Sequence, residues 1–285
     1  MSAQDRLAYE ARVRLRQAVI AVLAGVLLVA ASAMQLTGPH TKVDELTVDL
    51  ITANKRVPLD QIAAVINALA SLAIAATLTY LFAATRARNQ QLNQYIKWIA
   101  IGGGALAAIT GIAYSVVIAV KVHQFVTQGA QTYDQANHLT NSGELLALQL
   151  LGQAAALALA VAFVLVSLGA MRVGLLTRFM GYLGIFAGVL VLFQITQVPV
   201  VQGYWLVALG YLFSGRWPTG VPPAWRSGRA EPWASGQELR ARRVGAAAGR
   251  AKPTATPAPE AVGGPAPTPA RSRAGAPKRK RKRKR

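Results

Sequence analysis

Amide side chains are the polar groups with the clearest chemical potential inside the apolar stretches of this chain. Gln149 and Gln153 are four residues apart, so they share one face if their segment is helical. Together with Asn67 and Gln194 they form a candidate polar cavity for a small neutral ligand. The alternative interpretation is hydrogen bonding between helices, for which amides inside a membrane are often used.

Acid–base, metal and thiol chemistry find little support. We see no ionisable side chain deep inside an apolar stretch, which argues against a proton-coupled transporter or an intramembrane protease. The chain has no cysteine and three histidines, and the acids and histidines of its loops fit no metal motif. No nucleophile-elbow, phosphate-loop, zincin or dinucleotide-binding motif occurs. We therefore expect no enzyme, no cofactor and no metal.

A dense run of positive charge ends the sequence. Of the 31 Lys and Arg residues, 18 follow Ser214, and the last eight residues are all basic. Such a run attracts anionic lipid headgroups, and it also neutralises the phosphates of RNA. The candidate polyanion or membrane-surface site consists of Lys278, Arg279, Lys280, Arg281, Lys282, Arg283, Lys284 and Arg285.

Six apolar runs supply the elements that must position these groups. They cover Ala18–Leu36, Gln61–Ala84, Trp98–Val120, Leu145–Ala170, Gly174–Ile195 and Val198–Phe213. At 1.5 Å per residue the first five are long enough for a hydrocarbon core of about 30 Å. The sixth is shorter, and it either spans with help from interfacial aromatic residues or is re-entrant. None shows the alternation of a β-barrel strand, so we predict an all-α transmembrane bundle of six helices, residues 18–214.

The charges of the connecting segments predict the orientation. With the N-terminus inside, the inner segments before the tail hold nine Lys and Arg residues, whereas the outer segments hold four. An even number of helices puts the basic tail on the same side as the N-terminus. We therefore predict a multi-pass protein of a bacterial plasma membrane with both termini cytoplasmic.

The remaining segments complete the predicted organisation. Residues 1–17 are a cytoplasmic N-terminal segment, and the first helix is retained, although Ala31-Ser32-Ala33 matches a signal-peptidase pattern. Residues 215–234 contain Trp, Pro and Arg and are predicted to lie against the headgroups, as a linker or as a docking surface for a partner. Residues 235–285 are rich in Ala, Pro and basic residues and are predicted to be a disordered tail.

Two resemblances bear on this interpretation. The sequence from Arg172 to Gly184, with the RxxGxLG spacing that starts at Arg178, the short sixth helix and the following GRWP…PPAW…PW segment resemble an uncharacterised family of multi-pass membrane proteins from high-GC bacteria. The resemblance covers about residues 170–235 and implies membrane threading but no activity. The basic tail is similar to those of bacterial membrane insertases, which approach ribosomal RNA, but the embedded arginine of those proteins is missing from the early helices.

Composition and motifs together predict a non-enzymatic membrane protein. Its leading function is binding of anionic lipid, or of RNA or a ribosome, through the tail, and the alternative is a transporter or channel for a small neutral solute. Small residues four apart, as in Gly184 with Gly188, Ala107 with Gly111 and Gly152 with Ala156, predict close helix packing within the bundle or in a homo-oligomer.

Overall fold

The computed structural model describes residues 3–39, 45–128, 130–193, 199–218, 220–233 and 240. The chain divides into two compact units, Met1–Trp233 and Ala234–Arg285, and the second lies outside the described residues except for Arg240. All regular structure in the described part is helical, in the order α1 (Ala3–Gln35), α2 (Leu46–Arg86), α3 (Tyr95–Thr127), α4 (Tyr133–Thr140), α5 (Gly143–Arg172), α6 (Arg178–Phe193), α7 (Val200–Phe213) and α8 (Pro223–Ser227).

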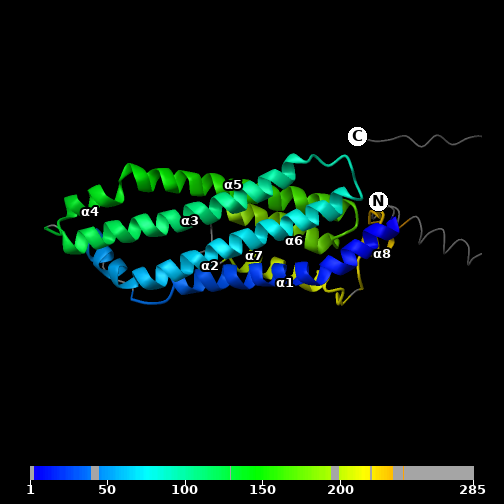
Figure 1. Ribbon diagram of the computed structural model, residues 1–285, viewed down its shortest axis with the longest axis horizontal. Coiled ribbons are helices and arrows are strands. Elements are labelled where there is room, and N and C mark those ends of the chain that lie inside the picture. The colour runs from blue at the N-terminus through cyan, green and yellow to red at the C-terminus, as the bar shows by residue number, and fades with distance from the viewer. Residues whose placement is uncertain are drawn as a thin grey trace, which may run out of the picture. The chain divides into compact units, whose positions relative to one another are not determined.

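Four of these helices are long and apolar enough to cross a membrane. Within the described residues they are Leu7–Gln35, Leu46–Arg86, Tyr95–Thr127 and Gly143–Arg172, whereas α6 and α7 are apolar but shorter. The prediction of an all-helical fold with long apolar helices is confirmed, and the crossing of a membrane by six helices stays a prediction. In Figure 1 the long helices run roughly side by side along the length of unit Met1–Trp233, with α2 between α1 and α3.

The second helix begins much earlier than its apolar run. The sequence predicts a loop before Gln61, but α2 begins at Leu46 and includes Pro58. Its first turns pack against the end of α3 and against α4, where Leu50, Val122, Phe125 and Ala136 form a small separate core. This prediction was wrong because tertiary contacts, and not continuous hydrophobicity, stabilise the first turns of α2.

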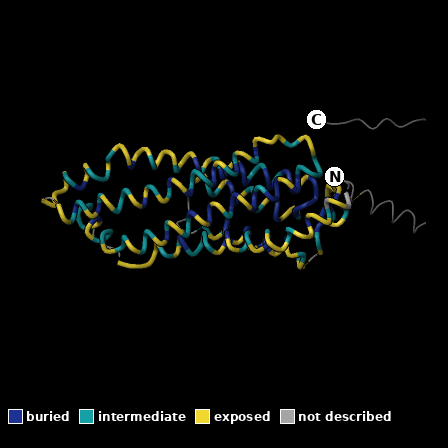
Figure 2. Tube along the Cα trace, in the orientation of Figure 1, coloured by how far each residue is buried: buried dark blue, intermediate teal, exposed yellow. Residues whose placement is uncertain are grey.

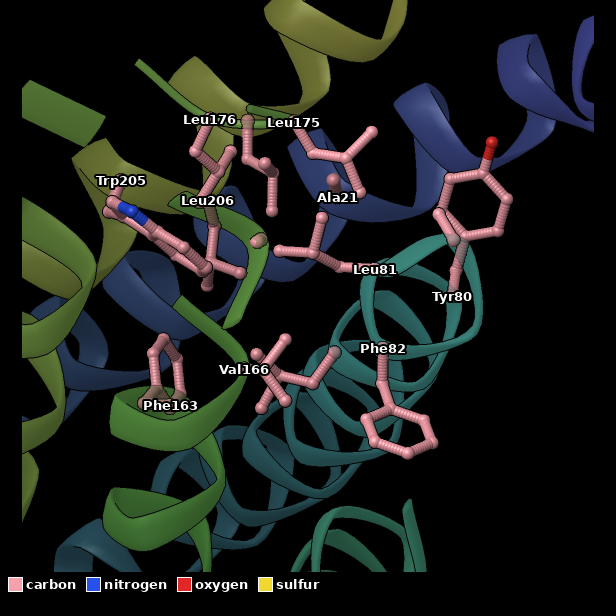
Figure 3. Close-up of a cluster of buried hydrophobic side chains, with 14 of the residues drawn as sticks. Ala21, Tyr80, Leu81, Phe82, Phe163, Val166, Leu175, Leu176, Trp205 and Leu206 are labelled. Carbon is pink, nitrogen blue, oxygen red and sulfur yellow. The ribbon is translucent and has the colours of Figure 1, made fainter. Parts of the chain in front are cut away.

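The main core lies toward the opposite end of the unit. Figure 2 shows the buried residues concentrated there, while the end that carries α4 is mostly half-buried or exposed. The core joins α1, α2, α5, α6 and α7, and Figure 3 shows Phe163 and Val166 of α5 close to Trp205 and Leu206 of α7. We call this the aromatic end, and we define it by the main core together with residues 173–177 and 220–233.

Glycines bring α6 close to α5. A Cβ at Gly184 would lie 2.3 Å from Ser167 Oγ, and one at Gly188 would lie 2.9 Å from the Ala160 carbonyl oxygen. The other two predicted small-residue pairs behave differently. A Cβ at Gly111 would meet nothing within 4 Å, and one at Gly152 would come only within 4.0 Å of Thr110. The first pair therefore serves packing inside the bundle, whereas Gly111 and Gly152 leave space.

Residues 220–233 fold back onto the bundle. Trp225 is 4% exposed, and its indole N–H donates to the Leu175 carbonyl at 2.9 Å. Trp233 donates in the same way to Leu176 at 2.7 Å, and the backbone N–H of Glu231 donates to Val173. Carbonyls of the α5–α6 turn thus offer the Trp225 indole a partner inside the protein, and the position of this segment at the headgroups stays a prediction.

The α5–α6 turn delays the start of α6. The fifth apolar run was expected to begin at Gly174, but residues 173–177 form a turn and the helix starts at Arg178. Gly174 has a φ of +79°, and a Cβ there would lie 2.0 Å from the Glu231 carbonyl oxygen. Both features require glycine, so the turn and residues 220–233 are fitted to each other.

Candidate functional site

Two adjoining polar cavities lie in the half of the unit away from the aromatic end. The central cavity, of about 550 Å³, is lined by α1, α2, α5, α6 and the start of α7. The lateral cavity, of about 440 Å³, lies between α3 and α5 beside α2. Asn67, Ala156, Leu159 and Val191 line both, so the two cavities share one wall. We call them the paired polar cavities.

Three of the four predicted cavity residues border the lateral cavity. Gln149 and Gln153 approach it from α5, and Asn67 approaches it from α2. Gln194, the fourth, lies outside the described residues. The residues come together because α2 and α5 both pack on α3, which brings the two amide-bearing faces toward the same space.

The central cavity adds polar residues that sequence reasoning missed. Ser32 and Gln35 come from α1, Ser71 from α2 and Gln202 from α7. Gln202 lies in the sixth apolar run, and its amide in such a run could have identified it as a candidate cavity residue. Ser32 and Ser71 follow no local pattern, and only the packing of α1 on α2 brings them to one cavity.

Serine and threonine hydroxyl groups around these cavities already donate hydrogen bonds to backbone carbonyls of their own helices. The Ser71 hydroxyl donates to the Asn67 carbonyl at 2.9 Å, Thr110 donates to Leu106 at 2.7 Å, and Ser32 donates to Leu28 at 3.0 Å. Bonding of this kind lets a hydroxyl occupy an apolar helix at little cost, while its lone pairs stay available to a further donor.

The amides are different. Gln202 is 4% exposed, and its Oε1 has no hydrogen-bond partner in the described part of the chain. Among the same residues no hydrogen bond joins the Asn67 or Gln149 side chain to another group. The interhelical amide bonds that were the alternative interpretation are therefore not made by these two side chains. Gln149 is exposed and Asn67 is half-buried, so only the Gln202 oxygen is both buried and unpaired among these three described amides. A buried amide oxygen without a partner is unfavourable, and water or a polar ligand in the central cavity is the partner available to it.

The lining of the paired polar cavities is uncharged. No Asp, Glu, Lys, Arg or His is among the described residues that line either cavity. Nor do three or more metal-ligating side chains gather anywhere in the described ranges. Amide and hydroxyl groups alone favour a ligand that both donates and accepts hydrogen bonds and carries no net charge.

A buried ion pair lies at the aromatic end, where sequence reasoning saw no embedded charge. Arg88 and Glu10 pair through two hydrogen bonds of 2.7 and 2.8 Å, with side chains 0% and 8% exposed. Arg88 also donates to the Ala224 carbonyl, and the guanidinium groups of Arg14 and Arg88 each lie 5.2 Å from the Trp225 ring centroid. This arrangement connects α1, the loop that follows α2, and α8. Glu10 and Arg88 are 78 positions apart in the sequence, so no local sequence pattern could predict their pairing.

The predicted polyanion site, Lys278–Arg285, lies outside the described residues. Comparisons with protein-family models, with curated proteins and with solved structures give no match to this chain.

Proposed function

We propose that this chain is a non-enzymatic, six-helix protein of a bacterial plasma membrane that binds a small uncharged solute in the paired polar cavities and carries it across the bilayer. In this proposal α6 and α7, about 24 and 21 Å long, cross the membrane together with the four longer helices. Local thinning of the bilayer accommodates such short helices at modest cost.

The observation that carries the proposal is the buried Gln202 oxygen without a partner among the described residues, in the central cavity that Asn67 also lines. Interior amides are normally satisfied, so an unsatisfied one beside a cavity supports a ligand or water at that place. The uncharged lining favours a neutral solute, because nothing there compensates the cost of bringing an ion into the membrane.

The densely packed main core favours a transporter over an open channel. It contributes Ile74, Leu159 and Phe163 to the lining of the central cavity, so passage of a solute toward the aromatic end requires the helices to move. Alternation between two arrangements around a fixed central site is the usual solution in membrane transport. We therefore expect slow, saturable uptake.

Uptake by the full-length protein in liposomes tests this function. Radiolabelled urea, glycerol, ribitol and glucose serve as probes of increasing size. At least one is expected to enter saturably, and Asn67→Leu combined with Gln202→Leu is expected to reduce its uptake at least tenfold. Gln90→Leu, which changes an exposed amide in the α2–α3 loop, is the matched control and should not alter the rate. Uptake equal to that of protein-free liposomes for all four solutes would refute the proposal.

The proposed orientation places the aromatic end on the cytoplasmic side of the membrane. It is supported by the basic residues of the inner segments and by the tail that follows Trp233. Asn67 is then about 28 Å along α2 from Arg86, in the outer part of the membrane. Single cysteines at the exposed Gln131 and Gln90 test this: a membrane-impermeant maleimide should label the first on intact spheroplasts but not the second. Labelling of Gln90 would reverse the orientation.

The tail supports a second function, adhesion to anionic lipid or contact with RNA. Eight consecutive basic residues support it, because each contributes about 1 kcal/mol near an anionic surface. The full-length protein in nanodiscs of neutral lipid should bind both anionic vesicles and RNA, much more weakly at high salt. Deletion of 271–285 should abolish both. Binding that survives the deletion would exclude the tail, and a preference for RNA at physiological salt would favour ribosome contact.

A further inference from the structure

A third cavity, of about 680 Å³, lies between α1, α2 and α3 on the side of the aromatic end, apart from the paired polar cavities. Small side chains make the space: the alanines that line it are Ala75, Ala76, Ala83, Ala84, Ala87 and Ala105. Its lining on α2 extends from Leu72 to Ala87, which corresponds to about 22 Å along the helix. We call it the alanine trough.

The trough follows the outward face of α2. Leu72, Ala76 and Ala83 line it and are exposed, and their spacing of four and seven residues places them on one side of the helix. Figure 1 shows α2 between α1 and α3, which form the two walls. In a bilayer this face meets lipid. One leaflet is about 15 Å of hydrocarbon, so the trough is long enough for an acyl chain of that leaflet.

Polar atoms without partners border this apolar space. Within the described residues, no hydrogen bond reaches the hydroxyl oxygens of Tyr80 and Thr79 or the Oε1 of Gln17, although all three oxygens are buried. The Tyr80 side chain is 9% exposed, and in Figure 3 its hydroxyl points away from the apolar cluster that its ring joins. Glu10 also lines the trough, but its carboxylate oxygens already accept from Arg88.

We propose that the alanine trough binds a neutral glycerolipid of the bilayer, with an acyl chain along the alanines and hydroxyl and ester groups at Tyr80, Thr79 and Gln17. These three side chains can donate to an ester carbonyl and accept from a free hydroxyl. The acyl chain comes from a bilayer that is as apolar as the trough, so it contributes van der Waals packing against the alanines, and the polar groups supply the selectivity.

The charge on the residues that line the alanine trough disfavours binding of an anionic lipid. Glu10 is the only described charged residue among the lining groups, and Arg88, which neutralises it, does not line the trough. A phosphate or carboxylate headgroup would approach the acidic member of the pair and gain no basic partner in the trough. A neutral headgroup avoids this repulsion and satisfies the unpaired oxygens.

Photolabelling of the full-length protein in phosphatidylcholine liposomes tests the site. The probe is a monoacylglycerol with a diazirine in its acyl chain, and phosphatidylglycerol and a free fatty acid with the same diazirine chain are the anionic comparisons. Peptide mapping should place the monoacylglycerol adducts on the lining of α1, α2 and α3, with yields at least fivefold above those of both anionic probes.

Two sets of variants separate the chain site from the headgroup site. Ala76→Phe with Ala83→Phe fills the trough and should reduce labelling about tenfold, whereas Ala154→Phe, at an exposed alanine of α5 that lines none of the three cavities, should not. Tyr80→Phe keeps the ring and should reduce labelling by the neutral probe about fivefold, with little effect on the anionic probes. Unchanged melting temperatures verify the fold of each variant.

Two outcomes would overturn the proposal. Adducts spread evenly over the lipid-facing surface, unaffected by Ala76→Phe with Ala83→Phe, would mean that the trough holds no lipid of its own. Equal labelling by the neutral and anionic probes, or no effect of Tyr80→Phe, would mean that the trough does not recognise a neutral headgroup. Neither outcome depends on solute uptake, so this inference and the proposed function fail separately.

Discussion

The aromatic end and the paired polar cavities use similar residue types for opposite purposes. At the aromatic end, glycines such as Gly184 bring helices into contact, and Trp225 finds both a hydrogen-bond acceptor and ring partners. At the cavities, Gly111 and Gly152 face open space, and the Gln202 oxygen has no partner among described residues. A small or polar residue in a membrane helix therefore indicates close packing only when a neighbouring helix supplies the complementary surface.

The largest loss of stability is expected from breaking the buried ion pair. Arg88→Met leaves the Glu10 carboxylate buried without its partner, which should lower the free energy of unfolding by about 3–5 kcal/mol. Adding Glu10→Leu should restore most of this loss. Unfolding in mixed micelles with increasing sodium dodecyl sulfate measures the free energies. A loss as large in the double variant as in Arg88→Met would show that the contacts to Ala224 and Trp225, and not the ion pair, stabilise this end.

Removal of the Trp225 indole tests the packing of the aromatic end. Trp225→Ala removes ring contacts with Tyr80 and Phe213 and the hydrogen bond to Leu175, so a loss of about 3 kcal/mol is expected. Trp98→Ala, at a position 57% exposed, is the control and should change stability by less than about 0.5 kcal/mol. The same unfolding assay applies. Equal effects of the two substitutions would contradict the assignment of Trp225 to the core.

Two glycine substitutions compare the regions directly. Gly184→Ala forces a methyl group toward Ser167 and Trp205 and should destabilise the protein by about 1–3 kcal/mol. Gly111→Ala adds a methyl group in open space and should stabilise α3 by up to about 1 kcal/mol, because alanine favours the helix. Melting temperatures of the two variants in one detergent give the comparison. Destabilisation by Gly111→Ala would mean that the lateral cavity is filled by another group.

The last prediction is also a small gain in stability. Gln202→Leu removes a buried oxygen without a described partner, so it should raise the free energy of unfolding by about 1 kcal/mol while it impairs uptake of the solute. Stability and uptake are measured on the same preparation. A loss of stability greater than about 1 kcal/mol would show that the amide is satisfied within the protein, and it would weaken the argument for a ligand.

The sequence alone was enough to predict the long apolar helices and to identify most of the amide residues within them. Four of the six runs match helices long enough to span, because continuous hydrophobicity over about 20 residues has few other solutions. Asn67, Gln149 and Gln153 were recognised because amides are conspicuous inside such runs. Gln202 carried the same signal and was overlooked, whereas Ser32 and Ser71 carried none.

Hydrophobicity along the chain thus determined that the chain is helical and that it has helices long and apolar enough to cross a membrane. Tertiary structure alone decided that α2 starts at Leu46, that Trp225 is buried, and that Glu10 pairs with Arg88 across 78 positions of sequence. The physical reason is the range of the interactions. Partition into a bilayer depends on each segment's own composition, whereas a cavity, a buried indole or an ion pair depends on which segments meet.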